Sequence, residues 1–208
     1  MRGRRLTWTI GGIGLIACGV ARILLSALLG SPLTSALSVA ADILWATSVL
    51  VFTIGASSRD SVVARRPLGM IALTLVALWP LALQVIGFLL GPAAAASLIP
   101  WAVATFAPLA FALVAVVQIG RIAVAPHPWR WAPAVALAVT LGCAAIGQAL
   151  FVGADPSTAQ QMVGLAQALG VLGFLAHTLG LGIVAILAVA SERPASVPIY
   201  SSPPEGRT

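Results

Sequence analysis

Six stretches of mostly apolar residues follow one another along this chain, and short segments with Gly, Pro or charged residues separate them. A transmembrane helix needs about 20 consecutive apolar residues, and each stretch is long enough to cross a bilayer. The stretches cover residues 6–29, 36–56, 68–90, 98–119, 132–152 and 162–190. We therefore predict an all-α polytopic membrane protein whose six transmembrane helices form one bundle over residues 1–190.

Composition excludes an ordinary soluble domain. Charged residues make up 8% of the chain, whereas soluble domains carry about 25%. The sequence pI of 11.4 is typical of some nucleic-acid-binding proteins. Here, however, the arginines lie in small groups beside apolar stretches, where such groups orient helices, and we expect no nucleic acid as a partner.

The placement of the arginines predicts the orientation of the bundle. Apart from Arg22, they alternate between the connections: Arg2, Arg4 and Arg5 precede the first stretch, Arg59, Arg65 and Arg66 follow the second, Arg121 and Arg130 follow the fourth, and Arg193 and Arg207 follow the sixth. The other three connections contain neither Arg nor Lys. The positive-inside rule then places both termini in the cytoplasm. The use of arginine without lysine suggests a GC-rich bacterial genome, so we expect the bacterial cytoplasmic (plasma) membrane.

The two ends of the chain need separate interpretations. Residues 191–208, SERPASVPIYSSPPEGRT, are rich in Ser and Pro and predict a disordered cytoplasmic tail. At the other end, LIAC at 15–18 resembles a lipoprotein signal that would be cleaved before Cys18. The apolar stretch continues past Cys18 to Leu29, which favours a transmembrane helix over a short signal sequence.

Arg22 and Asp42 are the two charges inside the first two apolar stretches. Counted from the predicted outer ends of their helices, they lie about 10 Å and about 9 Å deep. Opposite charges at one depth in adjacent helices gain by pairing, because hydrocarbon penalises each charge alone. The alternative is that each side chain extends separately to the outer headgroups.

Other polar side chains fall at a similar depth in the remaining stretches. Gln84, Gln148 and Gln167 lie four to six residues from the predicted outer ends, counted as rough depths. Together with the ion pair and His177, they predict a polar pocket that opens outward. His177 is the only histidine within a predicted span; it can relay protons or bind a cation, or it can simply hydrogen-bond between helices.

The sequence leaves three functions open. The first is a small transporter-like or ligand-binding protein whose pocket is formed by Arg22, Asp42, Gln84, Gln148, Gln167 and His177, with Arg22 meeting an anionic group. The second is a structural or accessory subunit of a membrane complex, or a homo-oligomer. A membrane enzyme is third, because we find no catalytic motif and expect no catalytic residue, metal site or cofactor.

One further contact is expected at the cytoplasmic surface. In HPWRW at 127–131, Trp129 and Trp131 flank Arg130, a pattern that fits an anionic lipid beside the general contact with the lipid bilayer. The simpler interpretation is the belt of aromatic residues that many membrane proteins carry at the interface.

Overall fold

The computed structural model of the protein describes residues 2–27, 33–55, 61–122, 129–151 and 156–191. Over these residues the structure contains helices and turns and no strand, and six helices are long and apolar enough to cross a membrane. The predicted all-α membrane bundle with six spans is therefore confirmed. Residues 192–208 of the predicted tail lie outside the described residues.

The helix bounds follow the apolar stretches closely. The first five spans are α1 (Arg2–Ala27), α2 (Leu33–Ile54), α3 (Pro67–Leu90), α5 (Trp101–Ile122) and α6 (Ala132–Ala149), the last preceded by the short 3₁₀ helix η1 (Trp129–Trp131). The sixth span joins three consecutive elements: α7 (Pro156–Leu175), the π-helical turn η2 (Ala176–Gly180) and α8 (Leu181–Ala190).

Two connections that we expected to interrupt the helices are partly helical. Residues 92–98 form a short helix, α4 (Pro92–Leu98), and Gly91 at φ 79° separates it from α3. The apolar sixth span runs from Met162 to Ala190, as predicted, but the helix that contains it begins earlier, at Pro156. In both places a proline occupies the first helical position, where its missing N–H has no helical partner to lose.

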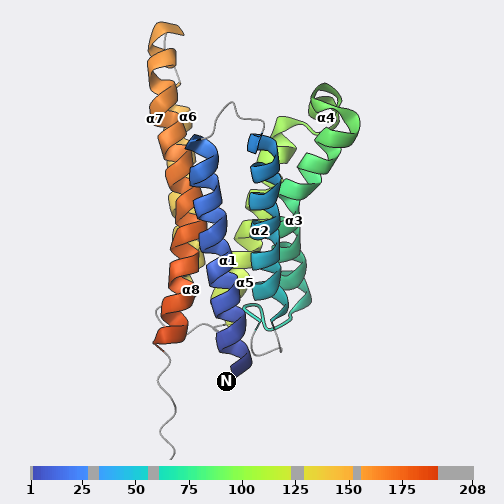
Figure 1. The fold of residues 1–208 in the computed structure, drawn as a ribbon, viewed down its shortest axis with the longest axis vertical. Helices are drawn as coiled ribbons and strands as arrows, with labels where there is room; N and C mark the ends of the chain where they lie inside the picture. The colour runs from blue at the N-terminus through green and yellow to red at the C-terminus, as the bar shows by residue number, and fades with distance from the viewer. Residues whose placement is uncertain (1, 28–32, 56–60, 123–128, 152–155, 192–208) are drawn as a thin grey trace, which may run out of the picture.

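The contacts between helices join the six spans into a ring in chain order. Figure 1 shows α1 between α8 and α2. Helix α1 packs against α2 and against α8, so that the first and last spans are neighbours. Helix α2 packs against α3, α3 against α5, and α6 against α7. Helices α5 and α6 contact each other only sparsely, which makes their junction the loosest part of the ring.

Glycines allow α1 to approach both of its neighbours closely. A Cβ atom at Gly182 of α8 would lie 2.8 Å from the backbone oxygen of Gly12. On the side that faces α2, a Cβ atom at Gly14 would meet the hydroxyl of Ser48. The obstacle at Gly182 is backbone and cannot turn away, so this glycine sets the spacing of α1 and α8, as small residues commonly do in membrane bundles.

Residues 61–65, in the connection between α2 and α3, fold back onto the end of α2. Ser61 Oγ donates a hydrogen bond to the carbonyl of Thr53 at 2.6 Å. The Arg65 guanidinium donates to the carbonyls of Ile54 and Gly55 at 3.1 and 3.2 Å. These carbonyls have no helical partner, and a cation is favourable there because the helix C-terminus carries partial negative charge.

Candidate functional site

A cluster of three polar side chains joins α1, α2 and α3. The guanidinium of Arg22 forms a salt bridge with Oδ1 of Asp42, and Nε2 of Gln84 donates a hydrogen bond to Oδ2 of the same carboxylate. The Asp42 side chain is 7% exposed and that of Arg22 is 32% exposed. Three helices thus share one buried carboxylate, which places the predicted Arg22–Asp42 pair and Gln84 in direct contact.

The guanidinium of Arg22 also faces the sixth span. Its Cζ atom lies 5.4 Å from the centroid of the Phe174 ring, within the range of a cation–π contact. Its Nε atom is buried and has no hydrogen-bond partner among the described residues. One turn earlier on α1, the Cys18 thiol lies 3.3 Å from the carbonyl of Ala41, so α1 and α2 are linked at two successive levels.

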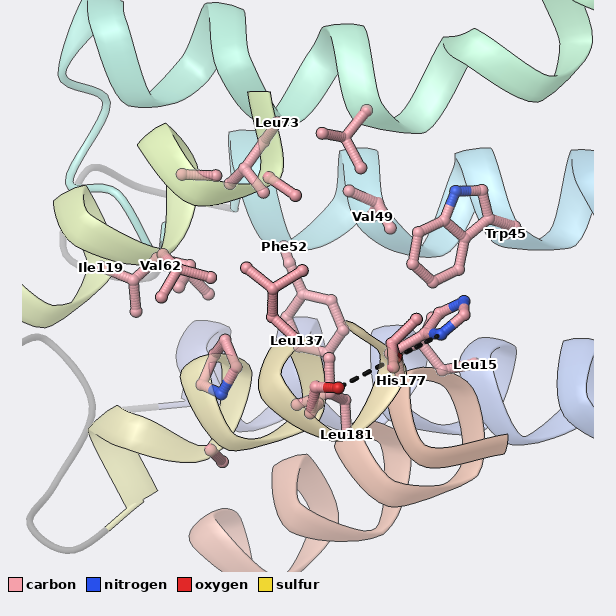
Figure 2. A pocket seen from close by; sticks show the side chains of 18 of the residues that line it. Leu15, Trp45, Val49, Phe52, Val62, Leu73, Ile119, Leu137, His177 and Leu181 are labelled. Carbon is pink, nitrogen blue, oxygen red and sulfur yellow. Dashed lines mark hydrogen bonds between the residues drawn. The ribbon is translucent and has the colours of Figure 1, made fainter. Parts of the chain in front are cut away.

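His177 lies in the π-helical turn of the sixth span, between two aromatic rings. Its ring centroid is 5.2 Å from that of Trp45 and 4.9 Å from that of Phe174, and both pairs meet edge to face. Its Nδ1 atom lies 2.9 Å from the carbonyl oxygen of Gly173 and 3.5 Å from Oγ1 of Thr140 on α6. Figure 2 shows His177 beside Trp45. π-Helical turns are frequent at functional sites.

A cavity of about 490 Å³ lies inside the ring, and all six spans contribute to its wall. Along α1 the lining residues run from Trp8 to Arg22, fourteen residues apart, which corresponds to about 21 Å of helix. The polar lining residues Arg22, Asp42, Thr140 and His177 lie toward the end of the bundle where α1 ends. Most of the remaining wall is aliphatic or aromatic, including Val49, Phe52, Leu73, Ile119, Leu137 and Leu181 (Figure 2).

Two prolines stand in the cavity wall, in the middle parts of α3 and α5. Pro108 has no N–H to donate to the carbonyl of Ala104, four residues earlier. Nε1 of Trp79 supplies that hydrogen bond from α3 at 3.2 Å. Pro80 likewise cannot donate to the carbonyl of Val76, and both of these residues line the cavity.

The structure brings together four of the six residues expected in the pocket. Arg22, Asp42 and His177 line the cavity, and Gln84 holds the carboxylate of Asp42. Gln148 and Gln167 do not line it; their side chains are exposed on α6 and α7. The cavity also extends well beyond the predicted outer half, to Trp8 and Trp129 near the arginine-rich end of the bundle.

Sequence reasoning missed most of the cavity wall. Thr140 could have been predicted, because a hydroxyl in an apolar stretch needs an acceptor. In the structure it donates a hydrogen bond to the carbonyl of Ala136 or of Gly173, at 2.9 and 3.0 Å. Trp45 and Leu137 could not have been predicted from the sequence, because apolar side chains face lipid and cavity alike. In the part of the chain that the structure describes, no three His, Cys, Asp or Glu side chains group as metal ligands would.

No family model, curated protein or solved structure matches the chain. The fold and the site therefore define only a class. The protein is a multi-pass helical membrane protein with a largely apolar internal cavity and a polar cluster at one end of that cavity.

Proposed function

We propose that the protein binds a small amphipathic molecule inside its helical bundle, as a ligand-binding or small transporter-like protein of a bacterial cytoplasmic membrane. In this proposal both termini are cytoplasmic, which follows from the arginines at one end of the bundle. The polar cluster then belongs to the outer half of the membrane. The apolar part of the cavity reaches toward the cytoplasmic half.

The observation that carries this proposal is the cavity itself. Protein interiors are close-packed, and voids of more than a water or two are few. A cavity of about 490 Å³ falls within the range of small-molecule sites, which are mostly apolar with a few placed polar groups. Its wall has that composition, with aliphatic and aromatic side chains over most of its length and the polar residues toward one end.

The tryptophans provide a direct test of occupancy. Four of the six, Trp8, Trp45, Trp79 and Trp129, line the cavity. We expect bromododecane, whose bromine quenches tryptophan on contact, to quench the full chain in phosphatidylcholine nanodiscs in a saturable manner. The fluorescence titration measures the apparent affinity.

A matched pair of variants locates the binding. Ala112 lines the cavity on α5, whereas Ala110 on the same helix is exposed. We expect Ala112→Phe to fill part of the cavity and weaken the saturable quenching at least about tenfold, because a ligand and an inserted ring cannot share the space. Ala110→Phe should leave the affinity unchanged. Equal titrations for the two variants, or quenching that never saturates, would remove the proposal.

An accessory or oligomeric role is the second candidate, and the exposed Gln167 on α7 favours it. A glutamine amide that faces hydrocarbon lacks partners, whereas a second helix against α7 can supply them. Crosslinking between copies carrying Gln167→Cys measures this directly. A crosslink at Gln167→Cys but not at the exposed Leu187→Cys on α8 supports an assembly through α7.

We further propose that Arg130 contacts an anionic lipid at the cytoplasmic surface. Its Nε atom is buried and has no partner among the described residues, and its Cζ atom lies 5.5 Å from the ring of Trp131. Trp131 is 48% exposed and can reach the headgroup region, while Trp129 lines the cavity. Of the two tryptophans that flank Arg130, only Trp131 is therefore proposed as a lipid contact. Arg130→Gln should reduce the retention of phosphatidylglycerol during purification, measured by lipid mass spectrometry.

A further inference from the structure

We infer that the cavity takes an uncharged amphiphile whose polar end is a hydroxyl-type hydrogen-bond donor, accepted by Nε2 of His177. This inference rests on the proposal that the cavity holds a ligand. It deepens that proposal by naming the chemistry of the ligand. The supporting observations are the hydrogen bonding of His177, the charges in the cavity wall and the acceptors left without a donor.

The hydrogen bonds of His177 fix which ring nitrogen carries the proton. The partner of Nδ1 at 2.9 Å is the carbonyl oxygen of Gly173, which can only accept. Nδ1 is therefore the donor, and in the uncharged ring Nε2 is left as an acceptor. Nε2 has no hydrogen-bond partner among the described residues. Unlike Nε of Arg22, it is not among the fully buried nitrogen atoms without a partner, and His177 lines the cavity.

The charges in the wall favour an uncharged headgroup. Arg22 and Asp42 are the charged residues that line the cavity, and each neutralises the other. Both oxygens of the Asp42 carboxylate are already engaged, by Arg22 and by Gln84. The pair is neutral overall, so a charged headgroup would enter the cavity without an unpaired opposite charge to meet it. This argues against the sequence-based expectation that Arg22 meets an anionic group.

Two acceptors in the residues of the wall lack a donor. Besides Nε2 of His177, the carbonyl of Val76 lacks its usual helical donor because Pro80 has no N–H. The hydroxyl of Thr140 donates to a carbonyl oxygen and is not free to donate to a ligand. A ligand that offers a hydroxyl can donate to these acceptors, whereas an ether or ketone has no hydrogen to donate.

The remainder of the cavity determines the body of the ligand. From His177 toward the arginine-rich end, the wall consists of side chains such as Leu137, Phe52 and Ile119 (Figure 2). Such a wall stabilises a hydrocarbon chain or ring system by excluding it from water. The ligand class is therefore a lipid alcohol or a similar molecule with one hydroxyl end.

The first experiment determines which ring nitrogen of His177 carries the proton, without changing that residue. The chain contains two histidines, so His127→Gln leaves His177 as the only signal in protein labelled with nitrogen-15 histidine. In nanodiscs we expect NMR to show a protonated Nδ1 and an unprotonated Nε2, and we expect dodecanol to shift the Nε2 resonance. A protonated Nε2, or an Nε2 resonance that dodecanol leaves in place, would overturn the inference.

The second experiment measures the selectivity for the hydroxyl. Dodecanol and dodecyl methyl ether compete with bromododecane for the cavity, and their affinity ratio is compared between the wild type and His177→Phe. One hydrogen bond to a buried acceptor predicts about five- to tenfold tighter binding of the alcohol in the wild type and a ratio near one in the variant. Because membrane partitioning is the same for both proteins, it cancels in the comparison.

The two proposals fail in different ways. If alcohol and ether bind equally well to the wild type, and both lose affinity in Ala112→Phe, the cavity holds a ligand but the inference about its headgroup is wrong. If neither compound competes with bromododecane, and Ala112→Phe changes nothing, the proposed function itself is wrong. A ratio of about five or more that disappears in His177→Phe supports both.

Discussion

Asp42 is the residue on which three helices converge. Removing its charge leaves the guanidinium of Arg22 without a counter-ion in an apolar bundle. We expect Asp42→Asn to lower the free energy of unfolding by about 2 kcal/mol, less than the loss for a fully buried pair because the Arg22 side chain is 32% exposed. Unfolding in mixed detergent micelles, followed by tryptophan fluorescence, measures the change.

The interpretation of that loss depends on a second variant. In Arg22→Met with Asp42→Asn both charges are gone, and most of the lost stability should return because no uncompensated charge remains. Gln148→Leu, at an exposed side chain outside the cavity, serves as the control and should be close to neutral. Losses that simply add in the double variant would mean that the two side chains do not act as a pair.

Trp79 and Pro108 form a coupled pair of a different kind. The indole of Trp79 donates to the Ala104 carbonyl, to which Pro108 cannot donate. We expect Trp79→Phe to cost about 1 kcal/mol in the wild type and clearly less in a Pro108→Ala background, where the new backbone N–H at position 108 takes over the carbonyl. A double-mutant cycle measures the coupling, with the exposed Trp101→Phe as the control. Equal costs in both backgrounds would contradict this account.

The close approach of helices α1 and α8 depends on the absence of a side chain at Gly182. A Cβ atom there would lie 2.8 Å from the backbone oxygen of Gly12, which no rotamer change can move away. Gly182→Ala should therefore lower the free energy of unfolding by about 1 kcal/mol or more, even after the gain in helix propensity. Gly147→Ala, which has no atom within 4 Å of the new Cβ, is the matched control and should not destabilise. Equal effects at both glycines would show that the close approach does not matter.

The sequence predicts the helical elements well wherever length and hydropathy decide them. All six spans are recovered because a long apolar stretch has few other structures open to it in a membrane. The details that it does not predict arise from local geometry. Gly91, at positive φ, ends α3 while the alanines that follow form α4, and the π-helical turn at Ala176–Gly180 has no characteristic residue pattern.

The difference between what residue counting decides and what local geometry decides also explains which site residues could be predicted. The depth of Arg22 and Asp42 follows from counting residues along two adjacent helices, and a shared depth allows the two charges to pair, as they do. Gln148 and Gln167 were placed at a matching depth too, but their helices turn these side chains away from the cavity. Rotation of a helix about its axis depends on the packing of all its neighbours, and a membrane helix that is apolar on every face gives little signal for it.

Two exposed serines at opposite ends of the bundle provide a test of its orientation in the membrane. Ser97 lies on α4, at the end of the bundle without arginines, and Ser191 follows α8 at the arginine-rich end. With Cys18 and Cys143 replaced by alanine, we expect Ser97→Cys in intact bacterial cells to react with a membrane-impermeant maleimide. Ser191→Cys should react only after the membrane is permeabilised, because a helix end flanked by arginines stays on the cytoplasmic side. The reverse labelling would place the polar cluster in the cytoplasmic half, and a hydroxyl-bearing ligand would then bind with its polar end toward the cytoplasm.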